Sequence, residues 1–225
     1  MREIVIDTET TGLDPQTGHR VVEIAALELV NHLPTGKVYH TYVNPERGMP
    51  EAAFAIHGLT AEFLASSPVF GAVAGEFLAF IAGATLVIHN AEFDLAFINA
   101  ELARLGFAAL AGPVIDTLTL ARRRFPGQPA SLDALCRRYN IDLSVRERHG
   151  ARIDGELLAA VYLELIGGRQ PGLDLAAAAA VTATLAVVPR SQRPARPHAP
   201  SPEELMAHAA LVAKLREPLW RSLAA

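Results

Sequence analysis

The chain has 225 residues, of which 51% are hydrophobic, and its formal net charge is −4. This length suffices for one well-packed domain with an appendage. The single cysteine, Cys136, excludes an internal disulfide and a cysteine-rich zinc site. The sequence enters a strand-like segment without a basic-then-apolar leader, and its longest apolar stretch, residues 175–188, is short for a membrane span. We therefore expect a soluble, cytoplasmic protein.

The charge is unevenly distributed along the chain. The first 168 residues carry 13 basic and 20 acidic side chains, whereas the remainder carries seven basic and four acidic ones. A protein that holds nucleic acid mainly by neutralising phosphates would be basic. Either the acidic part avoids nucleic acid, or it reaches an anionic substrate through bound cations.

The predicted elements alternate in a way that is typical of an α/β domain. Strands are expected at residues 3–7, 21–29 and 37–43, then at 85–88 and 114–116. A helix is expected to start with Ser67 as its cap and Pro68 at its first position, and further helices at 93–105, 117–124, 131–139 and about 154–166. The order βββ-α-β-α-β-ααα indicates a mixed five-stranded sheet flanked by helices.

The composition changes after residue 168. Residues 176–180 are five alanines, and residues 189–202 contain five prolines and three arginines, which is typical of a flexible linker. Ser201 and Glu204 form a capping box, and the helix that follows is too short to fold alone. We therefore predict a domain at residues 1–168, a linker at 169–200 and a docking tail at 201–225.

Two carboxylates end the first predicted strand. Asp7 and Glu9 are two residues apart on an extended segment, so both side chains leave the same face. Carboxylates this close repel, and one would be protonated unless a cation lay between them. Carboxylate oxygens suit Mg²⁺ or Mn²⁺. The alternative is a hydrated strand end at the surface.

Two further clusters lie at the starts of predicted helices. Asp94 follows His89 and Asn90 and begins a helix, where the helix dipole favours an anion. The alternative is that Asn90 caps this helix and Asp94 is an ordinary surface residue of its first turn. His89 suits a structural role as well as a substrate contact. His149 lies in a polar loop five residues before Asp154, which suits a histidine acting on substrate beside a metal-bound aspartate. An exposed loop histidine is the alternative.

Taken together, these clusters resemble the DEDDh 3′–5′ exonucleases of the ribonuclease-H-like fold. The matching motifs are Asp7-x-Glu9 after an apolar strand, HNAEFD ending at Asp94, and His149-x₄-Asp154. TETTGLD and IHGLT are also typical of this family, and the resemblance covers residues 3–168. It implies a two-metal phosphodiesterase that removes nucleotides from a 3′ end as 5′-monophosphates.

The resemblance also implies roles for individual residues. Two Mg²⁺ or Mn²⁺ ions would be held by Asp7, Glu9, Asp94 and Asp154, with Asp7 bridging both, and His149 would take the proton of the attacking water. Other residues would contact the terminal nucleotide: Thr10, Thr11, Gly12, Leu13, His57, Asn90 and Phe93. Leu13 would act as a wedge, although Leu13 and Phe93 also suit an ordinary core. The segment around Asp154 departs from the family, since Arg152 and Gly155 replace the more usual apolar residue and alanine.

The tail adds expectations about partners. It resembles the tails of proofreading subunits of bacterial replicative polymerases, which implies docking on the polymerase catalytic subunit through residues 201–225 and excision of mispaired 3′ nucleotides from frayed DNA. Gln170, Leu173 and Leu175 match the Q-x-x-L-x-[L/F] layout of sliding-clamp peptides, with a plain linker as the alternative. The rival functions are a free-standing exonuclease trimming single-stranded DNA or RNA, and a non-catalytic binding module.

Overall fold

The computed structural model describes residues 1–144, 149–168 and 199–216. The chain divides into two units, residues 1–173 and 174–225, and each is described by itself. Among the described residues, no helix combines the length and the apolar character needed to cross a bilayer. The predicted clamp-binding peptide (Gln170, Leu173 and Leu175) lies outside the described residues, as does the end of the predicted docking tail, residues 217–225.

The first unit is built on a mixed five-stranded sheet, as predicted. Its strands are β1 (Arg2–Thr10), β2 (Val21–Val30), β3 (Leu33–Tyr42), β4 (Thr85–Ile88) and β5 (Val114–Asp116), in the order β3-β2-β1-β4-β5. The pairs β1–β2 and β2–β3 are antiparallel, whereas β1–β4 and β4–β5 are parallel. The carboxyl ends of β1, β4 and β5 therefore meet at one edge of the sheet, where ligands of α/β proteins commonly bind.

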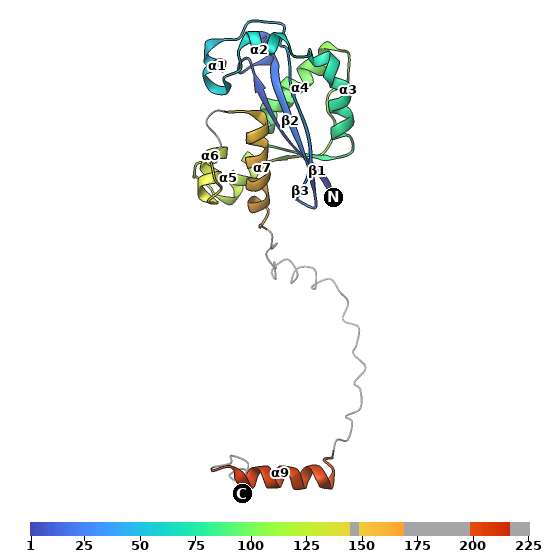
Figure 1. The fold of residues 1–225 in the computed structure, drawn as a ribbon, viewed down its shortest axis with the longest axis vertical. Helices are drawn as coiled ribbons and strands as arrows, with labels where there is room; N and C mark the ends of the chain where they lie inside the picture. The colour runs from blue at the N-terminus through green and yellow to red at the C-terminus, as the bar shows by residue number, and fades with distance from the viewer. Residues whose placement is uncertain (145–148, 169–198, 217–225) are drawn as a thin grey trace. The chain divides into compact units, whose positions relative to one another are not determined.

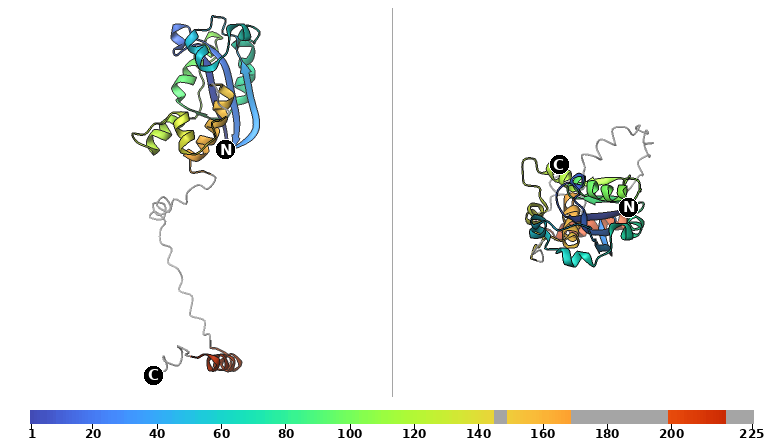
Figure 2. Two further views of the ribbon diagram at one scale, coloured as in Figure 1. Left: turned by 60° about the vertical axis from the view of Figure 1, so that its left-hand side comes forward. Right: turned by 90° about the horizontal axis from the view of Figure 1, so that it is seen from above.

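Helices cover both faces of this sheet (Figures 1 and 2). Helices α3 (Phe70–Ile81) and α4 (Ala91–Arg104) pack on one face, and α5 (Thr117–Arg124), α6 (Leu132–Arg138) and α7 (Ala151–Leu165) lie on the other. Alternation along β1 divides the core, because Ile4 and Ile6 face the first group while Val5 faces the second. Burying both faces explains the apolar run that opens the sequence.

Short elements absent from the predicted order complete the unit. They are the 3₁₀ turn η1 (Pro15–Thr17) and the helices α1 (Glu51–His57) and α2 (Ala61–Ala65). Helix α1 has no side-chain cap at Pro50, and α2 spans only five residues, so neither gives a strong periodic signal. His57 is consequently the last residue of a helix that the sequence did not indicate.

Three predicted helix starts were wrong, and in the first case α4 begins at Ala91, two residues before its expected start. Helix α3 begins at Phe70 rather than at Pro68, because Pro68 accepts a backbone hydrogen bond from Asn44 and Val69 pairs with Asn44 in a parallel bridge. This pairing keeps the expected first turn extended. Helix α7 begins at Ala151, three residues before its expected start, so Asp154 lies within the first turn instead of opening it.

In the second unit, the described helix is α9 (Pro202–Lys214). Its predicted capping box is present, with Ser201 accepting from the Glu204 backbone and Glu204 accepting from the Ser201 backbone. The large apolar side chains on it are exposed: Leu205, Met206 and Leu211. This surface has the character expected of a segment that docks on another protein.

Candidate active site

The strand–helix junctions at the sheet edge bring the four predicted acids together. Asp7 and Glu9 come from β1, Asp94 from the first turn of α4, and Asp154 from the first turn of α7. Glu9, Asp94 and Asp154 are buried, with 9%, 4% and 4% of their surface exposed. From sequence spacing alone, Asp7 and Glu9 could both lie at a hydrated strand end. Burial rules this out for Glu9, whereas Asp7 is intermediate in exposure and faces a pocket.

The electrostatics of the cluster show how unfavourable it is without a counter-charge. Burial, followed by repulsion from Asp94, Glu9 and Asp154, raises the pKa of Asp7 well above its usual range. Burial also raises the pKa of Asp94 to about 7, although a hydrogen bond from Thr8 opposes this shift. Carboxylates arranged in this way fit a divalent cation, because its charge offsets both the cost of burying them and their mutual repulsion.

His149 lies directly beside this cluster. Its Nδ1 is 3.1 Å from Asp154 Oδ2, and its side chain is half exposed. Ligand atoms of Glu9, His149 and Asp154 all lie within 4.8 Å of one another, a spacing that would suit one metal ion. The backbone N–H of His149 donates to Ile56, which ties the histidine loop to α1.

A pocket of about 290 Å³ opens onto the acids. Its lining combines predicted residues with others that the sequence did not single out: Asp7, His89, Ser131, Leu132, Asp133, His149 and Asp154. His89 is partly buried, its Nδ1 is 2.9 Å from Thr117 Oγ1, and burial lowers its pKa. Ser131 and Asp133 open helix α6, and only the packing of α6 against α7 carries them to the site, so no local motif could reveal them.

A second pocket of about 290 Å³ lies around the predicted nucleotide contacts Leu13, Asn90 and Phe93. Leu13 is 83% exposed, which removes the alternative of an ordinary core leucine. Phe93 packs against the core, with its ring 5.0 Å from that of Phe97, and also lines the pocket. Asn90 has a left-handed backbone (φ 67°) and makes no side-chain cap, so the capping role that the sequence allowed is wrong.

The loop after β1 is fixed by its own hydrogen bonds. Thr10 Oγ1 donates to the Gly12 carbonyl at 2.6 Å, and Thr11 Oγ1 lies 3.1 Å from His19 Nδ1. The His19 ring covers Gly12 so closely that a Cβ there would lie 2.3 Å from it. Gly12 is therefore needed for this close approach, and Thr10 and Thr11 support the loop with side chains that are buried.

His57 is buried beside this loop. Its Nδ1 accepts from the Leu59 backbone, whereas its buried Nε2 faces the backbone of Thr10 without a close hydrogen bond. Burial lowers the pKa of the imidazole. An orphaned ring nitrogen at this place fits a group that becomes satisfied when a ligand binds.

The two departures around Asp154 have structural explanations. Arg152 Nε lies 3.3 Å from Glu156 Oε1 on the exposed face of α7. Gly155 is buried, and a Cβ on it would lie 2.6 Å from Leu27 Cδ1. The missing methyl group therefore allows α7 to approach β2 closely at the turn that carries Asp154.

Comparison with known proteins places the fold and site in context. A family model described as "Exonuclease" (RNase T type) matches residues 4–162. The DNA polymerase III subunit epsilon of Rickettsia prowazekii is 55% identical over 175 residues, covering 76% of each chain. That of Rickettsia conorii is 46% identical over 222 residues, covering 96% of each chain, so this similarity extends into the tail. Among solved structures, exonuclease X in complex with 5′ overhanging duplex DNA is 27% identical, with a TM-score of 0.58, and covers 73% of this chain and 90% of that one.

Proposed function

The chain belongs to the RNase T exonuclease family, and on this premise we propose that its acids and His149 hydrolyse the terminal phosphodiester at a frayed 3′ end of DNA. The protein is a 3′–5′ exonuclease of the proofreading type. The observation that carries the residue assignment is the convergence of Asp7, Glu9, Asp94 and Asp154 beside His149 at the carboxyl edge of the sheet.

The four acids would hold two divalent cations, Mg²⁺ or Mn²⁺, at this edge. Asp7 is central among them, because Glu9, Asp94 and Asp154 all raise its pKa, and it is therefore assigned as the shared ligand. Bound there, the two ions would stabilise the attacking and leaving oxygens of an in-line displacement at phosphorus. Their charge would also let an acidic domain hold a polyanion.

His149 is assigned as the base that takes the proton of the attacking water. With Nδ1 donating to Asp154, the other ring nitrogen, Nε2, is the one that would accept this proton. The half-exposed side chain can adjust to a bound strand, whereas Asp154 is anchored in the first turn of α7. The products are a nucleoside 5′-monophosphate and a strand shortened by one residue.

The second pocket would receive the terminal nucleotide. Exposed Leu13 would wedge against the last base, while Phe93 and Asn90 shape the wall. Backbone groups of Thr10, Thr11 and Gly12 would line its sugar, and His57 would donate or accept through Nε2. Such a pocket accepts an unpaired terminus, so selectivity for a mismatch comes from fraying rather than from base identity.

The tail would connect the nuclease to its polymerase. The exposed leucines and methionine of α9 would dock on the catalytic subunit of a replicative polymerase, together with the rest of residues 201–225. Gln170, Leu173 and Leu175 would bind the sliding clamp. Tethering raises the concentration of the nuclease at the primer end without any new contact to DNA.

A primer assay tests the catalytic assignment. The full chain is incubated with Mg²⁺ and a 3′-mismatched primer, made of DNA or RNA and annealed to a template. We expect the mismatched DNA primer to release deoxynucleoside 5′-monophosphates. This release should be faster than hydrolysis of the paired DNA primer or of the RNA primer. Asp7→Asn should abolish release, and Asp142→Asn, which removes an exposed carboxylate bonded to Ser144, should not. Equal rates on paired and mismatched ends would overturn the proofreading assignment.

A binding experiment tests the tail. Chains ending at residue 168 should hydrolyse the primer like the full chain but fail to capture the polymerase catalytic subunit. The double variant Leu205→Glu/Leu211→Glu should reproduce that loss in the intact chain, because it places charge on the exposed face of α9. Retained capture by the truncated chain would contradict the docking assignment.

A further inference from the structure

A buried carboxylate beside the four acids of the site, that of Glu23 on β2, is not among the assigned metal ligands. It is 3% exposed and lies directly opposite Glu9 in the antiparallel register of β1 and β2. Like charges in facing positions of a sheet repel, so this placement is unfavourable for the sheet itself. Glu23 also raises the pKa of Asp7, which places it within electrostatic range of the acid cluster.

The two oxygens of Glu23 have different partners. Oε1 lies 2.7 Å from Nε2 of His40 on the neighbouring strand β3. Oε2 accepts a hydrogen bond of 3.2 Å from the backbone N–H of Ala151, the first residue of α7. The carboxylate therefore joins the sheet to the start of the helix that carries Asp154.

Helix α7 lacks a cap of its own. Its N-cap residue is Gly150, which has no side chain to accept from the first turn, and Ala151 is fully buried, so water cannot satisfy its N–H. An unsatisfied buried N–H is costly, and the positive end of the helix dipole favours an anion here. Glu23 on β2 provides the hydrogen-bond acceptor for this N–H, a role that a serine or aspartate at the N-cap position usually has.

The position of this bond decides what it controls. Ala151 lies two residues after His149 and three before Asp154, and the bond from His149 Nδ1 to Asp154 Oδ2 spans the same turn. Fixing the Ala151 N–H therefore fixes both side chains relative to β1, where Asp7 and Glu9 reside. Errors of about 1 Å in such placement cost on the order of 100-fold in rate.

We propose that Glu23, oriented by His40, is a positioning residue that holds the first turn of α7 so that His149 and Asp154 meet the acids of β1. This inference rests on the proposed function of those four residues. Glu23 itself is assigned no contact with substrate or metal. It acts through the backbone of Ala151.

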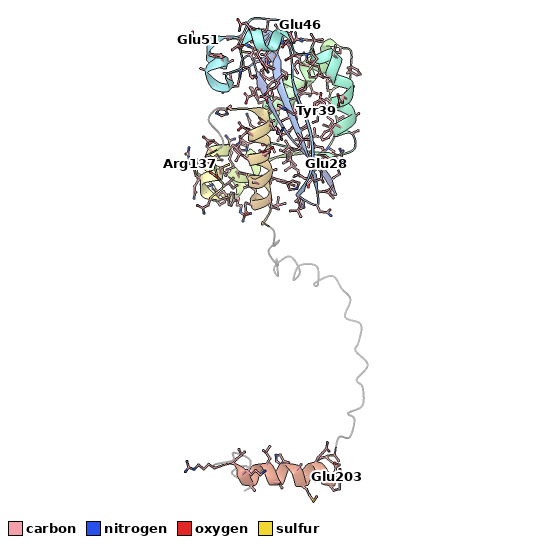
Figure 3. All side chains as sticks on the ribbon, in the orientation of Figure 1. Glu28, Tyr39, Glu46, Glu51, Arg137 and Glu203 are labelled. Carbon is pink, nitrogen blue, oxygen red and sulfur yellow. The ribbon has the colours of Figure 1, made fainter. Side chains whose placement is uncertain are left out.

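Two substitutions separate this role from a general loss of stability. Glu23→Ala removes the acceptor, whereas Glu23→Gln keeps a carbonyl oxygen for Ala151 and an amide that can pair with the other tautomer of His40. Glu28→Ala is the matched control, because Glu28 is an equally buried carboxylate of the same strand, 6% exposed and paired with Arg2 and Lys37. Glu28 pairs with Ile4 of β1, whereas Glu23 pairs with Glu9, so the two glutamates lie at different ends of the strand pair (Glu28 is labelled in Figure 3).

The first readout needs neither metal nor activity. Hydrogen exchange of the Ala151 amide is measured in the full chain with chelator present. We expect protection in the wild-type chain and in Glu23→Gln, and faster exchange in Glu23→Ala, with the core of β1 protected in all three. Unchanged protection in Glu23→Ala would overturn the proposed contact.

The second readout is the kinetic parameters for primer hydrolysis with Mn²⁺. Glu23→Ala should lower kcat by about 10–100-fold, as loss of a group supporting a metal ligand does, with KM for the primer within about twofold. Glu23→Gln should recover most of this loss, and Glu28→Ala should leave kcat unchanged. Wild-type kcat in Glu23→Ala, or an equal loss in Glu28→Ala, would refute the positioning role. Failure of the wild-type chain to hydrolyse would refute the proposed function instead.

Discussion

The hydroxyl of Thr8 donates a hydrogen bond of 2.7 Å to Asp94 Oδ1, joining the middle of the acid motif on β1 to the first turn of α4. Because side chains alternate along β1, Thr8 lies on one face of the sheet while Asp7 and Glu9 lie on the other. Residues 7–9 therefore contribute to the site from both faces of the sheet. The bond fixes one oxygen of Asp94 and favours its ionised form. Thr8 is thus a support for a metal-binding acid, a role that the sequence did not indicate.

Replacing Thr8 by valine should shift the activity profile toward alkaline pH. Without the hydroxyl, the pKa of Asp94 rises further above about 7, so a larger fraction is protonated and unable to bind metal at neutral pH. We expect kcat near neutral pH to fall by about 10–100-fold and to recover partly as the pH rises. The measurement is kcat against pH at saturating Mn²⁺.

The chain offers a matched control for this substitution. Thr119 Oγ1 also donates at 2.7 Å to an aspartate, Asp116, but at an exposed position on α5. Thr119→Val should leave the pH profile in place. If kcat of Thr8→Val fell by the same factor at every pH, without an alkaline shift, the Thr8 hydroxyl would affect only the position of Asp94 and not its pKa.

The metal-free domain should lose stability as the pH rises through neutrality. Asp94 has a pKa of about 7 in the folded state, against an ordinary value of 3.8 for an aspartate. A carboxyl whose pKa is raised by folding contributes stability that is complete below about pH 4 and is lost progressively toward about pH 7. In chelator, the melting temperature of the wild-type chain should therefore fall between about pH 5 and pH 8 more steeply than that of Asp94→Asn.

Added Mn²⁺ should reverse this trend in the wild-type chain. Metal binding requires deprotonated carboxylates, so the rise in melting temperature on adding metal should be larger at about pH 8 than at about pH 5. Asp94→Asn should show a smaller rise at both. If the melting temperatures of the wild-type chain and of Asp94→Asn fell equally with pH in chelator, burial of Asp94 would not be the cause of the lost stability.

Much of this architecture could be predicted from local signals. The i, i+2 spacing of Asp7 and Glu9 predicted their common face. Helix α5 was predicted with its observed bounds, and in the structure Asp116 caps it by accepting from the Leu118 backbone. Features decided by long-range packing could not be predicted in this way. Ser131 and Asp133 reach the pocket only because α6 packs on α7, and Glu23 caps a helix that lies 128 residues later in the chain.

Replacing Gly12 by alanine should weaken substrate binding. A Cβ at this position would lie within 2.5 Å of three atoms of the His19 ring, so His19 must move and its contact with Thr11 is lost. The loop that carries Leu13 would then lose its support, and we expect KM for a primer to rise by about tenfold with a smaller change in kcat. Steady-state kinetics on single-stranded oligonucleotides measure this split.

Gly48 provides the comparison for this loop. A Cβ there meets nothing within 4 Å, so Gly48→Ala should leave both parameters near wild type. His19→Ala alone removes the contact with Thr11 without adding a Cβ at Gly12, so it should raise KM to a similar extent if the lost contact is the cause. A wild-type KM in His19→Ala would show that this contact does not support the loop.

Removing the imidazole of His149 should separate chemistry from metal binding. In His149→Ala the four acids remain, so we expect kcat to fall by about 10²–10⁴-fold, the usual contribution of a general base, while Mn²⁺ affinity stays near wild type. Asp7→Ala should instead lose both, because its carboxylate lies among all the other acids. Calorimetric titration with Mn²⁺ and single-turnover hydrolysis on the same preparations measure the two quantities. The cluster of Glu9, His149 and Asp154 also permits His149 as a direct ligand, and a matching loss of Mn²⁺ affinity in His149→Ala would establish that role in place of the base.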